Sequence, residues 1–113
     1  MVDNTQKIID SRDLIGFIED NRDELPAHEL QPYLDFAKEF EDYAPDYIHG
    51  EVAIRYDYFV WYCTELVSDI GYIPDDLPGL IESNINWEGI ADDLKHDYAE
   101  IDFDGTAYYV RCV

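Results

Sequence analysis

Apolar residues at helical spacing predict a helix early in the chain. Leu14, Ile15 and Ile18 would form its buried stripe. Ser11 can serve as its N-cap, because a serine hydroxyl accepts a hydrogen bond from an unpaired backbone N–H of the first helical turn. Residues 1–10, which precede this helix, are interpreted as a flexible leader.

A second helix follows a break at residues 21–26. Its apolar stripe lies within Leu34–Phe40, and Pro32 is expected in its first turn, where the missing N–H of proline is not needed. Residues 43–50 are interpreted as a loop and residues 52–55 as a short extended segment. The acids on the side of the helix opposite the stripe are Asp35, Glu39 and Asp42.

The third predicted helix has the strongest apolar stripe in the chain. Asp57 is its expected cap, and Gly71 is expected at its C-terminal end, where glycine adopts a left-handed backbone without strain. Cys63 lies on the stripe and is interpreted as a packed thiol, since free cysteines are usually buried. The stripe consists of Phe59, Tyr62, Cys63, Leu66 and Ile70.

The C-terminal third combines a helix with alternating, strand-like residues. Asn86 can cap a fourth helix with Trp87, Ile90, Ala91 and Leu94 facing inward, and the proline-containing residues 72–83 before it are irregular or a single turn. Apolar and polar residues then alternate on both sides of Asp104-Gly105, a dipeptide typical of a type I′ hairpin turn. We therefore expect an α+β fold: a small single domain of about four helices followed by a C-terminal β-hairpin.

Charge adds a constraint to this fold. The 113 residues include 27 Asp and Glu against 7 Lys and Arg, for a formal net charge of −20, yet 47% of the chain is hydrophobic. That apolar content is too high for a disordered acidic tail, so the charge must lie on the faces of folded elements. Self-repulsion of this size destabilises a compact state. A folded domain that carries it needs a functional reason or a salty environment.

The size of the charge suggests a comparison with DNA. Duplex DNA carries one charge per about 1.7 Å of its axis, so twenty phosphates span about 34 Å. A globule of this length has an expected radius of gyration of about 13 Å. One face of the domain could therefore approach the charge density of a short duplex. Such a surface repels nucleic acid and attracts proteins that bind it.

The segment Glu100–Gly105 resembles the beginning of a calcium-binding loop. Asp102, Asp104 and Gly105 match the required positions, but Arg111 stands where such a loop needs a bidentate glutamate. We therefore interpret the segment as a hairpin turn with its acids on the polar side, and we expect no metal. A calcium-dependent or halophile-type domain remains a third hypothesis.

Catalytic chemistry is not indicated by the remaining residues. His28, His49 and His96 lie far apart in the sequence, and no nucleophile motif or glycine-rich phosphate loop is present. We therefore expect a protein that is not an enzyme and that has no cofactor. The start of the chain lacks the apolar core of a signal peptide, and the two cysteines, Cys63 and Cys112, fit a reducing cytoplasm.

Residues 56–113 resemble the C-terminal domain of the ArdA antirestriction proteins, which are acidic inhibitors encoded by mobile elements. In that family the corresponding run is a helix ending at a glycine, a proline-bearing loop, an aromatic-led helix and a hairpin. Residues 11–50 are more loosely similar to the family's middle region, and its N-terminal domain has no counterpart here. The stretches that carry the resemblance are DYFVWYCTELVSDIG (57–71), IPDDLPGLI (73–81), INWEGIADDL (85–94) and DFDGTAYYV (102–110).

The resemblance implies a DNA-mimic inhibitor. ArdA proteins are similar to bent B-form DNA in the layout of their carboxylates, dimerise through their C-terminal part and occupy the DNA groove of type I restriction–modification enzymes. This chain would then act in the cytoplasm of a bacterial host on a DNA-binding defence nuclease, without contact to nucleic acid or membrane, and could form a homodimer. The acids that would replace phosphates are Asp57, Glu65, Asp69, Asp75, Asp76, Glu82, Glu88, Asp92 and Asp93.

Two alternatives stay open. A shortened mimic has less reach, so a CRISPR effector complex is an alternative target, which would make the protein an anti-CRISPR inhibitor. The chain could also be an acidic adaptor that binds one basic host protein without displacing DNA. In the DNA-mimic hypothesis, exposed tyrosines would add contact area at low entropic cost. The candidates are Tyr43, Tyr47, Tyr56 and Tyr58.

Overall fold

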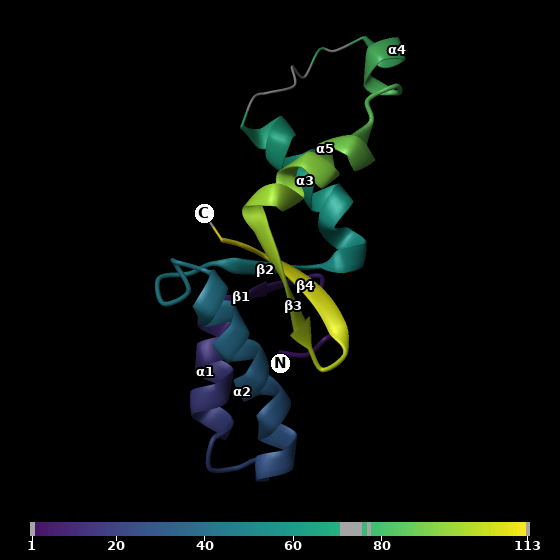
Figure 1. Ribbon diagram of the computed structural model, residues 1–113. Helices are drawn as coiled ribbons and strands as arrows, with labels where there is room; N and C mark the ends of the chain where they lie inside the picture. The colour runs from purple at the N-terminus through teal and green to yellow at the C-terminus, as the bar shows by residue number, and fades with distance from the viewer. Residues whose placement is uncertain (1, 71–75, 77, 113) are drawn as a thin grey trace.

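A four-stranded antiparallel sheet forms the middle of the molecule, and one group of helices lies at each end of the molecule (Figure 1). The computed structural model describes residues 2–70, 76 and 78–112. The strand order is β1-β2-β4-β3. The strands are β1 (Ile8–Asp10), β2 (Val52–Arg55), β3 (Tyr98–Phe103) and β4 (Thr106–Arg111). The helices are α1 (Ser11–Asn21), α2 (Ala27–Tyr43), α3 (Phe59–Asp69), α4 (Gly79–Glu82) and α5 (Trp87–Leu94), with 3-10 turns at Tyr56–Tyr58 and Lys95–Asp97.

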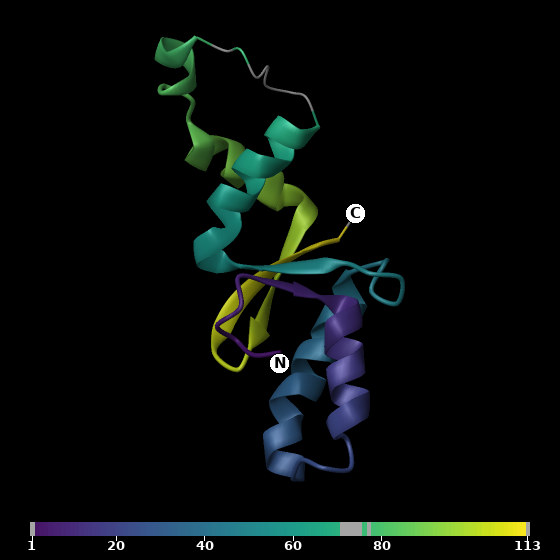
Figure 2. The same cartoon turned by 180° about the vertical axis from the view of Figure 1, so that it is seen from behind.

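The molecule is elongated. It measures 55 × 25 × 23 Å and has a radius of gyration of 16.4 Å, larger than the roughly 13 Å expected from chain length alone. The pair α1 and α2 forms one end, and α3, α4 and α5 form the other, as the front and back views show (Figures 1 and 2). We call this second end the helical lobe.

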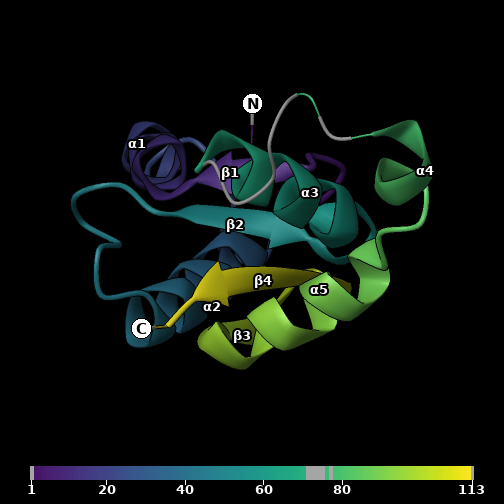
Figure 3. The ribbon, with the colours of Figure 1, turned by 90° about the horizontal axis from the view of Figure 1, so that it is seen from above.

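The sheet has both faces covered, which gives the molecule two apolar clusters. Consecutive residues of a strand point to opposite faces, so Tyr108 and Tyr109 belong to different clusters. The cluster containing Tyr108 joins the sheet to α1 and α2, while the cluster around Ile54, Phe59 and Cys63 joins it to α3 and α5. Seen from above, α3 and α5 lie over β2 and β4, with α1 and α2 beyond them (Figure 3).

The α+β prediction is confirmed, including the order of helices followed by the C-terminal hairpin. Asp104 and Gly105 have φ of 49° and 90°, as the predicted type I′ turn requires. The Asn86 side chain accepts a hydrogen bond from the Gly89 N–H at 3.1 Å, as predicted for the cap of the fourth helix. The one-turn helix α4 lies within the segment predicted to be irregular or a single turn.

The interpretation of residues 1–10 as a flexible leader is wrong. Ile8–Asp10 pairs with β2 as an edge strand, and Val2 is buried in the larger apolar cluster. The Tyr108 hydroxyl also donates a hydrogen bond to the Gln6 carbonyl at 2.6 Å. These contacts join segments that are far apart in the sequence, so local periodicity could not indicate them.

Several predicted helix boundaries need correction. Asp10 caps α1, because its carboxylate accepts from the Arg12 N–H at 2.9 Å, while Ser11 is buried and hydrogen-bonded to Glu51. Pro32 lies inside α2 rather than in its first turn. Asp57 belongs to the 3-10 turn before α3, which has no side-chain cap.

The apolar stripe of the third helix is partly corrected as well. Phe59 and Cys63 are buried as predicted, but Val67 takes the next buried position and Ile70 is 52% exposed. Ile70 follows the last helical residue, so the helical spacing no longer applies to it. The predicted C-terminal Gly71 lies outside the described residues.

Two glycines provide a test of the fold. A Cβ at Gly16, inside α1, would meet nothing within 4 Å, so Gly16→Ala should raise the free energy of unfolding by up to about 1 kcal/mol. Gly105 has φ of 90°, so Gly105→Ala should lower it by about 1 kcal/mol or more despite open space around the site. Urea unfolding of both variants at one salt concentration measures the difference. Equal effects of the two changes would contradict the hairpin turn.

Candidate functional site

The helical lobe carries the predicted phosphate-mimicking acids. Each of them that the structure describes is exposed. Asp57 lies in the 3-10 turn before α3, and Asp75 lies outside the described residues. The others follow the helices of the lobe: Glu65 and Asp69 on α3, Asp76 before α4, Glu82 on α4, and Glu88, Asp92 and Asp93 on α5.

Two of these acids have a cationic neighbour. Asp57 Oδ1 lies 3.4 Å from Arg55 Nε, and Asp92 Oδ1 lies 3.6 Å from Lys95 Nζ. The Lys95 ammonium is also held 5.2 Å from the centroid of the Tyr109 ring, which keeps it beside α5. These two carboxylates are therefore less available to a partner. Within the described part of the chain, the rest of the predicted set makes no ion pair.

A second group of acids lines a groove that the sequence did not predict. The groove, of about 520 Å³, lies between α2 and the hairpin turn. The Asp102 N–H donates to Glu39 Oε2 at 3.1 Å, and this bond ties the strand to the helix across the groove. Lys38 lies at its margin. The acids that line this acidic groove are Asp35, Glu39, Asp42, Asp102 and Asp104.

The sequence indicates the acids of α2 and the acids of the hairpin separately, but it does not indicate that the two sets lie side by side in the acidic groove. Asp35, Glu39 and Asp42 share one helix side because their spacing is close to whole turns. Asp102 points to the polar side of β3 by strand alternation. The contact between α2 and β3 is tertiary, so no local signal brings the two sets together. Within the described ranges, no group of His, Cys, Asp or Glu is arranged to hold a metal ion.

Exposed apolar side chains accompany the acids on the helical lobe. Trp61 is 57% exposed on α3, and Leu80 is 79% exposed on α4. Of the candidate tyrosines, Tyr43 and Tyr56 are exposed and Tyr58 is half-buried. The prediction for Tyr47 is wrong: it is 7% exposed and packs edge-on against Phe40, with ring centroids 5.1 Å apart.

Comparison of the chain with protein-family models, with curated proteins and with solved structures finds no significant match in any of the three. The ArdA resemblance therefore remains an expectation from the sequence. In the part of the chain that the structure describes, no helix is both long and apolar enough to cross a bilayer.

Cys63 connects α3 to the sheet and offers a chemical test of the lobe's packing. Its thiol is buried, as predicted, and burial raises its pKa to about 11. Cys112 is partly exposed, with its thiol donating to the Asp97 carbonyl at 3.3 Å. Because the thiolate is the reactive form, alkylation at pH 8 should modify Cys112 and spare Cys63.

Mass spectrometry after iodoacetamide treatment and cleavage at glutamate measures this difference, because Cys63 then lies in the peptide 52–65 and Cys112 in the peptide 101–113. The Cys112→Ser variant should remain unmodified in buffer and should become labelled at Cys63 once urea is added. Labelling of Cys63 at the same rate with and without urea would contradict the packing of α3 against the sheet.

Proposed function

We propose that this protein is a DNA-mimic inhibitor that occupies the DNA-binding channel of a host defence nuclease, such as a type I restriction–modification enzyme. The observation that carries the proposal is an elongated body, 55 Å long, with a formal net charge of −20 and exposed acids at both ends. The function consists of binding and includes no chemical step. It takes place in the cytoplasm of the bacterial host, where such nucleases meet DNA.

The charge density supports the comparison with DNA. The net charge of −20 corresponds to one charge per about 2.8 Å of molecular length, against one per about 1.7 Å for duplex DNA. The length of 55 Å equals that of about sixteen base pairs. The elongated shape therefore gives a single small domain more reach than a globule of the same mass.

Binding would follow from charge complementarity between this surface and a basic channel. Carboxylates replace phosphates opposite Lys and Arg, so association is fast and sensitive to salt. The exposed Trp61 on α3 and the exposed Tyr56 in the 3-10 turn before it add contact area. The exposed Leu80 and Ile81 supply an apolar surface for the self-association that the resemblance implies.

Salt dependence is the main test of this proposal. The dissociation constant for a purified type I enzyme, measured by calorimetry, should rise by about tenfold or more between 50 and 200 mM NaCl, because salt screens exposed charges. The same titration against a CRISPR effector complex tests the alternative target. Competition by unlabelled duplex DNA separates a mimic from an adaptor, since only a mimic shares the DNA channel. Affinity that does not change with salt would contradict mimicry.

Paired charge variants test which acids act as phosphates. Glu88→Gln/Asp93→Asn should weaken inhibition of DNA cleavage by roughly tenfold, because it removes two exposed charges from α5. The matched control is Glu41→Gln/Asp46→Asn, which removes two exposed charges outside the helical lobe, at the C-terminal end of α2 and in the loop after it, and should change inhibition less than about twofold. Equal weakening by both pairs would show that net charge, and not the lobe, determines inhibition.

A further inference from the structure

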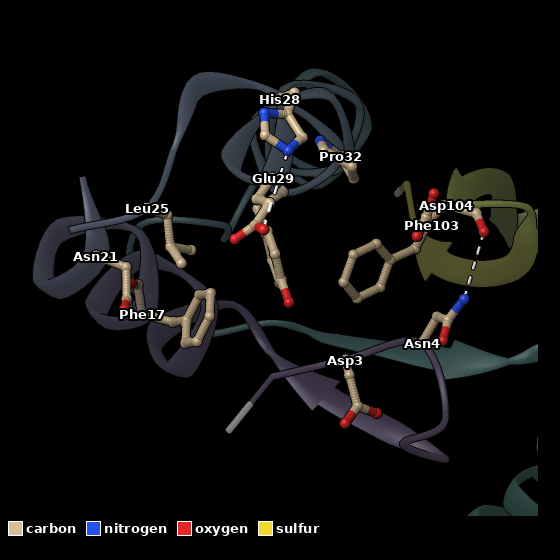
Figure 4. A pocket seen from close by; sticks show the side chains of 11 residues that line it. Asp3, Asn4, Phe17, Asn21, Leu25, His28, Glu29, Pro32, Phe103 and Asp104 are labelled. Atoms are coloured by element: carbon tan, nitrogen blue, oxygen red, sulfur yellow. Dashed lines mark hydrogen bonds and ion pairs between the residues drawn. The ribbon is translucent and has the colours of Figure 1, made fainter. Parts of the chain in front are cut away.

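An open pocket lies at the end of the molecule opposite the helical lobe. Its volume is about 650 Å³, and α1, α2, the N-terminal segment and the hairpin turn contribute to it (Figure 4). It borders the acidic groove, because Pro32 and Asp104 line both. Its apolar lining consists of Phe17, Leu25, Pro32, Tyr33 and Phe103. We call it the aromatic pocket.

Phe17 and Tyr33, both partly exposed, provide the open ring faces of the aromatic pocket, and Phe103, which is 2% exposed, lies behind them. The Tyr33 ring lies 4.6 Å from the Phe17 ring and 5.5 Å from the Phe103 ring, measured between centroids. Phe103 in turn stacks on the buried Phe36, with centroids 4.3 Å apart and planes 4° from parallel. The aromatic wall formed by these rings is therefore an extension of the core and is already in place before any ligand arrives.

Acids line the aromatic pocket on several sides (Figure 4). Asp3, Glu29 and Asp104 come from three different segments and all line it. Burial raises the pKa of Tyr33, and the charges of Asp3 and Asp104 raise it further, so both carboxylates act on the aromatic wall. Hydrogen bonds from Thr5 hold the pKa of Asp3 below its usual value, which keeps its carboxylate ionised at neutral pH. No Lys or Arg lines the pocket in the described structure. His28 also lines it, with its Nε2 atom 3.9 Å from Glu29 Oε1.

Aromatic rings beside carboxylates select a cation with a flat or apolar body. An anion would be repelled, and a neutral apolar ligand would desolvate the carboxylates without compensation. A guanidinium satisfies both sides, because it stacks on aromatic faces and donates in-plane hydrogen bonds to carboxylates. An ammonium is more strongly hydrated and lacks the planar face.

We propose that the aromatic pocket receives an arginine side chain of the basic protein partner. The proposal rests on the proposed function for the identity of that partner, whose DNA channel supplies exposed arginines. It extends the contact surface from the helical lobe to the α1 and α2 end of the molecule. An anchored arginine gives the inhibitor a specific contact in addition to its general negative charge.

N-acetyl-arginine amide is a direct probe of the pocket, and N-acetyl-citrulline amide is its neutral, nearly isosteric control. NMR titration with the arginine probe should give saturable shifts of the ring resonances of Phe17, Tyr33 and Phe103. The citrulline probe should give none at the same concentrations. Equal shifts with both probes, or arginine-induced shifts confined to the helical lobe, would overturn the proposal.

Charge variants separate a specific pocket from general attraction. In Glu29→Gln/Asp104→Asn the turn is retained, because asparagine tolerates the φ of 49° found at residue 104. This pair should weaken binding of the arginine probe by roughly fivefold, as expected for the loss of two nearby carboxylates. The control pair Glu41→Gln/Asp46→Asn removes two exposed charges that line neither the pocket nor the acidic groove, and it should leave binding of the arginine probe unchanged. Equal weakening of probe binding by both pairs would overturn the proposal that the pocket binds arginine.

The probe experiment and the nuclease assay fail independently. Saturable arginine binding in a protein that inhibits no nuclease would support the pocket and overturn the proposed function. Nuclease inhibition by a protein that shows no arginine binding would overturn the pocket and leave the proposed function standing.

Discussion

The stacked pair Phe36 and Phe103 is the contact on which the arrangement of this molecule depends. It joins α2 to the end of β3 with ring centroids 4.3 Å apart, and both rings are buried. Loss of such a buried ring typically costs about 3–5 kcal/mol, a large share of the stability of a small domain. The same contact places the acids of α2 beside those of the hairpin and completes the wall of the aromatic pocket. Core packing therefore determines where the negative surface lies.

Elongation makes a net charge of −20 compatible with a folded chain. Acids at the two ends of a 55 Å molecule are separated by several Debye lengths, since screening is about 8 Å at physiological ionic strength. Repulsion then acts mainly within each end, where the two apolar clusters oppose it separately. Tyr108 and Tyr109 show how one strand serves both clusters, since neighbouring residues of β4 pack on opposite faces.

Local chemistry was predictable from the sequence, and contacts between distant segments were not. The Asn86 cap and the Asp104-Gly105 turn depend on residues within four positions of each other, so their sequence signals were sufficient. The strand β1 exists because it pairs with β2 some forty residues later, and three residues carry no periodicity of their own. The acidic groove was missed for the same reason: its halves were recognised on helix and hairpin, but the hydrogen bond from Asp102 to Glu39 is tertiary. The burial of Tyr47 likewise depends on a tertiary contact, with Phe40 of the preceding helix, which the local sequence does not indicate.

The acids on α3 and α5 are spaced in a way that solvation of a helix surface does not require. Glu65 and Asp69 on α3, like Glu88 and Asp92 on α5, stand four residues apart and hence about 6 Å apart along the helix axis. Like charges at this spacing destabilise a helix by about 0.2–0.5 kcal/mol per pair. Of these four acids, only Asp92 has a nearby cation, Lys95, within the described structure. A chain that already bears strong self-repulsion thus carries further repulsive pairs on the helices of the lobe, which is understandable if a basic partner compensates them on binding.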